Sequence, residues 1–180
     1  MSGESPAEVR QIAVPSRLRT TSTLACTDYE DAFRLRPARP VERTAPEWAR
    51  AVLEEAPAPL RRTLLTAWGA LGLVLGDVPA QGFVLGWELR RCEPDRAVLA
   101  TESPLGIAGE LVFEGARDEL LYGTFVRLDG EAAARAWALI EPKHPPVVRQ
   151  LLELAGSRGA RPGAAQERAR SRRTIHQSTT

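Results

Sequence analysis

The pattern of apolar and polar residues changes its period twice along the chain. Between residues 44 and 75 apolar positions recur at the three- and four-residue spacing of helices, and from Phe83 to Ile140 short apolar runs are separated by turn residues. After residue 144 the helical spacing returns. This order predicts an α+β protein in which an antiparallel sheet is followed by a closing helix.

Two helices are expected before the main run of strands. The segment 44–47, Thr-Ala-Pro-Glu, has the form of a capping box, so the first helix begins there and ends before Pro57. The second helix spans about 59–75 and has one broad apolar face. Three glycines lie inside this helical pattern and therefore predict neither a phosphate-binding loop nor a bound cofactor: Gly69, Gly72 and Gly76.

One strand is expected ahead of these helices, where Tyr29, Phe33 and Leu35 occupy alternate positions. Five more strands follow in succession, and the hairpin-length links between them favour antiparallel pairing. We expect these five at 83–90, 97–101, 107–114, 120–128 and 133–140. A closing helix is expected from Pro145 to Ala155. The predicted order is β-α-α-β-β-β-β-β-α.

Length and composition fit one domain with additional segments at both ends. The chain has 180 residues, of which 43% are hydrophobic. Residues 1–23 are polar and contain two prolines, which predicts a disordered leader with a little structure near residues 12–14. Residues 24–155 are expected to form the domain. Residues 156–180 are rich in arginine and lack apolar periodicity, which predicts a disordered tail.

The charges of the chain say little about a partner. The formal net charge is +1, so no overall field points to nucleic acid. Of the 24 lysine and arginine residues all but Lys143 are arginines, a bias that fits a GC-rich genome better than a functional demand. A solvated tail is favoured over contact of its arginines with nucleic acid or an anionic surface. The oligomeric state is left open.

A soluble, cytoplasmic protein without a bound metal is expected. The N-terminus lacks the basic start and apolar core of an export signal, and no apolar segment reaches the roughly twenty residues of a membrane span. Cys26 and Cys92 are too few and too distant for a disulfide framework or a zinc site. The acidic residues 28, 30 and 31 are expected to form a solvated edge.

Four short stretches accompany this order of elements, at 28–33, 47–51, 84–87 and 141–146. With them the chain resembles the START-like superfamily of helix-grip proteins, also described as polyketide cyclase/dehydrase-like or SRPBCC proteins. In detail it is similar to uncharacterised bacterial helix-grip proteins of a domain-of-unknown-function family. The resemblance implies a curved antiparallel sheet wrapped around the C-terminal helix, with a pocket between them.

Two departures from that family are expected to narrow or fill the pocket. The closing helix, at about eleven residues, would be only about 16 Å long. The last predicted strand, 133–140, is rich in alanine. Both features bear on how large a ligand the pocket accepts.

Four aromatic residues on predicted central strands are the ligand-binding candidates, because large aromatics either fill a core or line a pocket: Trp87, Phe113, Phe125 and Trp137. The sequence does not decide between core packing and a role in lining a ligand pocket. Glu88 and Glu110 fall on the opposite faces of their strands and are expected to point to solvent, which excludes a paired-carboxylate site.

Three polar residues are the candidates for catalysis. Tyr122 and Arg135 interrupt the apolar strands and either face a ligand's carbonyl or carboxylate group or point to solvent. His144 lies where the last strand meets the closing helix and is suited to acid–base chemistry near neutral pH. No partner for it is close in sequence, so a role at the helix terminus is the alternative.

These observations lead to three hypotheses. The first is a protein that binds a small hydrophobic or amphipathic molecule in a cavity between the sheet and the closing helix. The second is an enzyme of cyclase/dehydratase type, which requires Tyr122, Arg135 and His144 to converge in that cavity. The third is a ligand-free interaction module with a filled core that contacts a partner through the basic tail.

Overall fold

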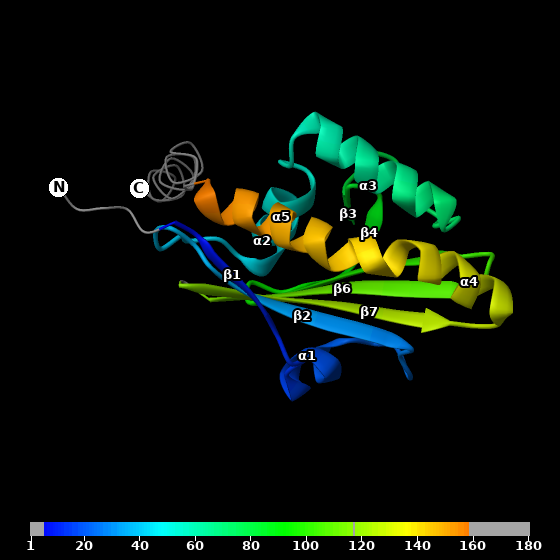
Figure 1. The fold of residues 1–180 in the computed structure, drawn as a ribbon. Helices are drawn as coiled ribbons and strands as arrows, with labels where there is room; N and C mark the ends of the chain where they lie inside the picture. Colours follow the sequence, from blue (N-terminus) through cyan, green and yellow to red (C-terminus); the bar gives the residue numbers. More distant parts are fainter. Residues whose placement is uncertain (1–5, 117, 159–180) are drawn as a thin grey trace, which may run out of the picture.

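The computed structural model describes residues 6–116 and 118–158 of the chain. Within them seven strands form a single antiparallel sheet in the order β1-β2-β7-β6-β5-β4-β3 (Figure 1). The strands are β1 (Glu8–Ile12), β2 (Tyr29–Arg36), β3 (Phe83–Val84), β4 (Trp87–Cys92), β5 (Arg96–Ser103), β6 (Ile107–Ala116) and β7 (Glu119–Leu128). The predicted α+β class and antiparallel pairing are therefore confirmed.

Within the described ranges, five α-helices and one 3-10 turn accompany the sheet. They are α1 (Ser16–Thr21), α2 (Ala45–Leu53), α3 (Ala58–Ala70), α4 (Glu131–Ile140), the 3-10 turn η1 (Glu141–Lys143) and α5 (His144–Ser157). The predicted capping box begins α2, because Thr44 accepts a hydrogen bond from the Glu47 backbone and the Glu47 carboxylate accepts one from the Thr44 backbone.

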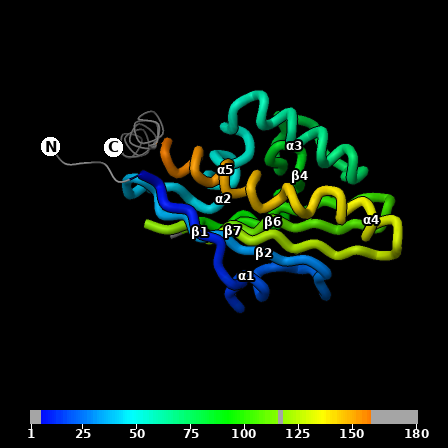
Figure 2. The backbone as a smooth tube through the Cα atoms, viewed as in Figure 1, coloured from blue at the N-terminus to red at the C-terminus, as the bar shows by residue number. Residues whose placement is uncertain are grey.

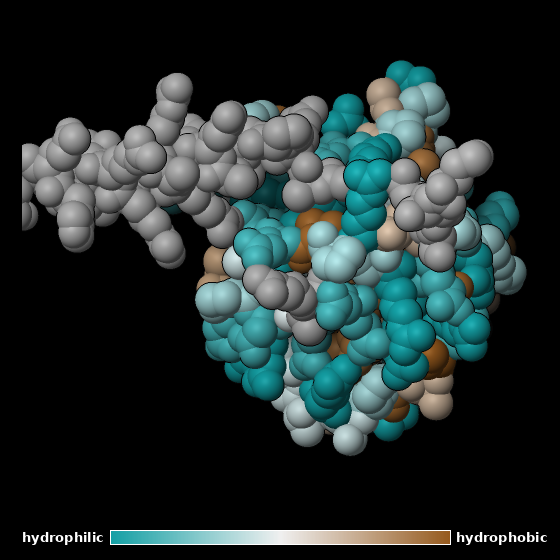
Figure 3. Space-filling model, turned by 90° about the vertical axis from the view of Figure 1, so that its left-hand side faces the viewer, coloured by the Kyte–Doolittle hydropathy of each residue, from teal (hydrophilic) through white to brown (hydrophobic). Residues whose placement is uncertain are grey.

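The elements form three layers, as the tube in Figure 2 shows. The helices α2, α3, α4 and α5 cover one face of the sheet, and the short α1 covers the other. The main apolar core lies on the first face, between the sheet, α2 and α5. A side view shows a mostly hydrophilic surface with small, separate apolar patches (Figure 3). No helix in the described part of the chain is long and apolar enough to cross a membrane.

The prediction of a fifth strand in the main run, at residues 133–140, is wrong. These residues belong to α4, which continues through η1 into α5, so helical structure extends over residues 131–157. Alanine has the highest helix propensity and is depleted in strands, and Glu131 pairs with Arg135 one helical turn later. The closing helical segment is therefore longer than expected.

The expected disordered leader, residues 1–23, differs from the structure from residue 8 onward. Residues 8–12 form β1, which pairs with β2, and Ser16–Thr21 form α1. Leu18 of α1 is fully buried in a small apolar cluster beneath that helix. The arginine-rich tail lies almost wholly outside the described residues, and its predicted disorder stays a prediction.

The residues that follow α1 bind the carboxylate of Glu110 and bury it. Ser22 and the backbone of Thr23 donate hydrogen bonds to its carboxylate at 2.7 and 2.8 Å, and the Thr23 hydroxyl donates a further one. Glu110 is fully buried, although its strand position was expected to face solvent. Glu88 is exposed, as expected.

Candidate functional site

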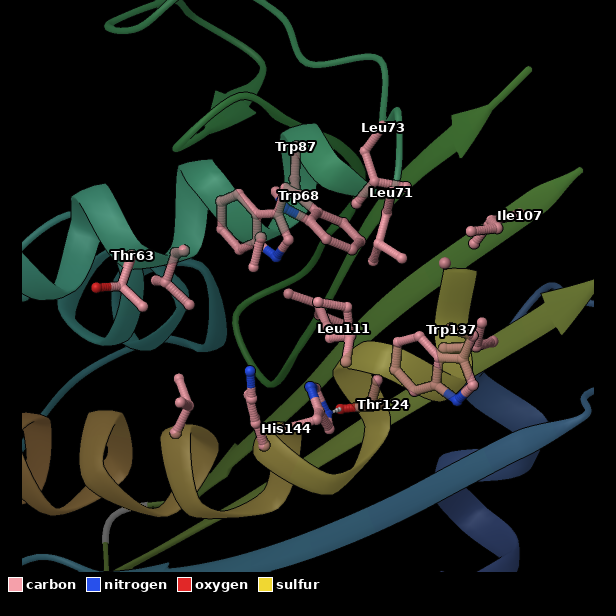
Figure 4. A pocket seen from close by; sticks show the side chains of 17 residues that line it. Thr63, Trp68, Leu71, Leu73, Trp87, Ile107, Leu111, Thr124, Trp137 and His144 are labelled. Carbon is pink, nitrogen blue, oxygen red and sulfur yellow. Dashed lines mark hydrogen bonds between the residues drawn. The ribbon is translucent and has the colours of Figure 1, made fainter. Parts of the chain in front are cut away.

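A pocket of about 160 Å³ lies between the sheet, α3 and the helical segment formed by α4, η1 and α5 (Figure 4). Helix α3 and the residues after it contribute one wall, and Ile140, Lys143, His144 and Val147 contribute to the opposite wall. Strands β4, β6 and β7 form the floor. Because the pocket is bounded by two separate helical segments, its shape depends on how both pack on the sheet.

The pocket wall is mainly apolar and contains three tryptophans. Trp68 of α3 and Trp87 of β4 pack edge to face, with ring centroids 5.5 Å apart. Trp137 of α4 lies on the other side and contacts the His144 ring at a centroid distance of 5.6 Å. Such a wall suits a ligand with a flat or compact apolar body.

Polar groups gather at the α5 end of the pocket. The Nε2 atom of His144 lies 3.1 Å from the Thr124 hydroxyl and 3.4 Å from Oδ2 of Asp31. The Tyr29 hydroxyl donates to that same Asp31 oxygen at 2.7 Å, and the Thr124 hydroxyl donates to the Tyr122 hydroxyl at 3.1 Å. These five residues form a connected network between β2, β7 and α5.

The backbone explains why these side chains meet. In β2, Tyr29, Asp31 and Phe33 are alternate residues and therefore share a face of the sheet. In β7, Tyr122 and Thr124 are related in the same way, and β2 and β7 are direct neighbours in the sheet. His144 is the first residue of α5, which packs across β2.

Burial shapes the electrostatics of this network. Asp31 is only 4% exposed, and its second oxygen, Oδ1, has no hydrogen-bond partner among the described residues. Burial lowers the pKa of His144, while the carboxylates of Asp31 and Glu141 act in the opposite direction. Burial also raises the pKa values of Tyr29 and Tyr122, so both phenols stay protonated near neutral pH.

The four predicted ligand-binding aromatics occupy different places. Trp87 lines the pocket, and so does Trp137, although Trp137 comes from a helix and not from a strand. Phe113 is fully buried in the main core beside the Tyr122 ring, outside the pocket lining. Phe125 lies on the opposite face of the sheet, in the cluster beneath α1.

The three catalytic candidates are brought together only in part. Tyr122 and His144 both contact the Thr124 hydroxyl. Arg135 lies on the exposed side of α4 and pairs with Glu131 at 2.8 Å, so it does not join them. The convergence of all three residues that was required for an enzyme is therefore not found.

Several residues of the pocket and of the polar network beside it were not predicted. Asp31 was assigned to a solvated edge, yet it shares the alternation of Tyr29, Phe33 and Leu35, and this pattern could have placed it on the buried face. Thr124 had a comparable signal, because it alternates with buried residues of its strand. No signal in the sequence indicated that Lys143 would line the pocket, because its position follows from the packing of α4 and α5.

No group of three or more His, Cys, Asp or Glu residues in the described part of the chain could hold a metal ion. Comparisons with protein-family models, curated proteins and solved structures give no match. The chemistry of the pocket is therefore the basis for a functional proposal.

Proposed function

We propose that this protein is a helix-grip protein of START-like type that binds a small, mainly apolar molecule in the pocket beneath α3. The observation that carries the proposal is the pocket itself, which has a mainly apolar wall with three tryptophans and a few polar side chains. Ligand sites typically combine an apolar lining with a few polar groups that fix orientation.

The volume limits the size of the enclosed part of the ligand. In another protein an apolar cavity of about 150 Å³ binds benzene. At about 160 Å³ this pocket suits one aromatic ring or a compact aliphatic group of similar size. A longer ligand would extend out of the pocket.

The proposal is tested by blocking the pocket from α3. Ala67 lines the pocket, whereas the neighbouring Thr66 is exposed and lies outside the lining. Ala67→Trp should fill the space and abolish binding of toluene and indole, measured by ligand-observed NMR. Thr66→Trp is the matched control on the same helix and should leave binding unchanged.

Two results would contradict the proposal: no binding of any small apolar probe to the wild-type protein, or equal binding by the Ala67→Trp and Thr66→Trp proteins. Native mass spectrometry of protein purified from its host adds an independent measurement. A small molecule retained by the wild type and lost in Ala67→Trp would support the pocket as its site.

An enzyme in the same pocket is a second candidate, and the contact of His144 with Asp31 and Thr124 favours it. A carboxylate that orients an imidazole is a common arrangement of a general base. A screen of β-hydroxy carbonyl compounds for loss of water tests this candidate. Products formed equally by wild type and His144→Ala would remove His144 from any such reaction.

A further inference from the structure

The polar contacts of His144 indicate which of its nitrogens carries the proton. Both of its polar contacts, to Asp31 and to Thr124, are made through Nε2. An ionised carboxylate can only accept a hydrogen bond, and the Thr124 hydroxyl already donates its proton to Tyr122. This pattern favours the tautomer that is protonated at Nε2, which leaves Nδ1 with a free lone pair.

That lone pair belongs to a side chain that lines the pocket. His144 is among the lining residues, and its side chain is 17% exposed. Nδ1 makes no hydrogen bond within the described residues, yet it is not among the buried polar atoms that lack a partner. It is therefore accessible, and Figure 4 shows the imidazole beside Thr124 at the pocket wall.

We propose that the ligand is a small aromatic molecule with a neutral hydroxyl group of phenol type, and that this hydroxyl donates a hydrogen bond to Nδ1 of His144. The inference rests on the proposed function and names the ligand class for the same pocket. The aromatic ring would then lie in the apolar space between the tryptophan-lined walls.

The charges near His144 favour a neutral donor over an ionised group. A carboxylate would meet an unprotonated Nδ1 and the nearby Asp31 carboxylate, both of which are electron-rich. Lys143, the cation in the lining, is exposed, so its attraction for a carboxylate is weakened by solvent. An ammonium group would lose its hydration in a mainly apolar pocket with Lys143 in its lining. A phenol avoids both costs, and its hydroxyl gains the one polar partner that the histidine offers.

The test compares phenol with toluene, which has a similar shape but no hydrogen-bond donor. Dissociation constants are measured by ligand-observed NMR for wild type and for His144→Gln. Glutamine places an amide nitrogen near the position of Nε2 and can keep the contact with Asp31, but it removes the acceptor at Nδ1. The toluene-to-phenol ratio of dissociation constants should fall by about 3- to 10-fold in His144→Gln, the effect of one hydrogen bond.

His144→Asn is the matched rescue variant, because its side-chain oxygen can occupy the position of Nδ1. In His144→Asn the toluene-to-phenol ratio of dissociation constants should lie between the values for wild type and His144→Gln. Toluene binding by His144→Gln shows that the variant is folded and its pocket intact. If that variant fails to fold, nitrogen NMR of the wild-type imidazole decides, since it distinguishes a protonated Nε2 from a protonated Nδ1.

The outcomes separate the inference from the proposed function. If neither phenol nor toluene binds the wild type, the proposed function fails. If toluene binds but the ratio is the same in wild type and His144→Gln, the pocket stands and the phenol inference is overturned. A proton on Nδ1 in the NMR spectrum overturns it as well.

Discussion

The Nε2 atom of His144 lies 3.4 Å from Oδ2 of Asp31, across the contact between the first turn of α5 and strand β2. This relationship joins a helix on one side of the pocket to the sheet beneath it. The Tyr29 hydroxyl holds the same oxygen of Asp31, so the carboxylate is fixed from two sides. The orientation of His144 therefore depends on this buried acid together with the Thr124 hydroxyl, which lies 3.1 Å from Nε2.

Replacing Asp31 with asparagine should lower the pKa of His144 further. Burial is the largest influence on that pKa and lowers it, and the Asp31 carboxylate is the foremost of the two charges that oppose burial. Asparagine keeps the shape but removes the charge. An NMR pH titration of the imidazole measures the shift.

Glu88→Gln is the control for this titration, because Glu88 is exposed and is not among the groups that shift the histidine. It should leave the pKa of His144 unchanged. An unchanged pKa in Asp31→Asn would mean that the two side chains do not interact in solution.

The sequence pattern predicted the sheet better than it predicted the site. Period-two alternation places residues on one face or the other of a strand whatever they contact later, so β5, β6 and β7 could be predicted. The single strand expected at 83–90 is instead divided into β3 and β4, which pair with each other. The segment 133–140 was assigned wrongly because a short apolar run is compatible with either a strand or a helix. Its alanines have a high helix propensity, and the segment forms part of α4.

The contact between His144 and Asp31 could not be predicted in the same way. It depends on how α5 crosses β2, which is a property of tertiary packing and has no local signal. The same holds for Glu110, whose burial requires the α1 segment to fold back over the sheet. Partners that are distant in sequence define both the site and the second core.

Glu110→Ala should reduce the free energy of unfolding by roughly 1.5–3 kcal/mol, the range for hydrogen bonds to a charged group. The substitution leaves the donors of Ser22 and Thr23 without their partner and loosens α1 from the sheet. Urea unfolding measures the change. Glu88→Ala, at an exposed position, should change the same free energy by less than about 0.5 kcal/mol; equal effects at both positions would show that the α1 contact does not stabilise the fold.

Gly106→Ala should be more destabilising than Gly130→Ala. Both glycines have positive φ angles, 91° and 93°, so each alanine bears a similar conformational cost of about 1–3 kcal/mol. At Gly106 the new Cβ would also overlap the backbone oxygen of Asp129, whereas at Gly130 it meets no atom within 4 Å. Thermal unfolding of the two variants isolates this clash, and equal melting temperatures would refute it.

The stability of the protein should fall as the pH drops through about 6.5, the ordinary pKa of an unfolded histidine. The titratable groups against His144 are Asp31 and Tyr29 from β2 and Glu141 from η1, and Lys143 precedes it in the chain. Their combined effect with burial is a lowered pKa in the folded state, so the unfolded chain takes up a proton first. Acid therefore favours unfolding, and the stabilising contribution of a neutral His144 is complete only above that pH.

The measurement is urea unfolding of wild type and His144→Gln at pH 8 and pH 5. Groups common to both proteins contribute similarly to each, so the difference between their free energies of unfolding reports His144. Wild type should lose more stability than His144→Gln on acidification, because only wild type carries a histidine whose pKa is lowered in the folded state. A wild type that gains stability relative to the variant would show that the attraction of Asp31 for a protonated His144 outweighs the cost of burying its charge.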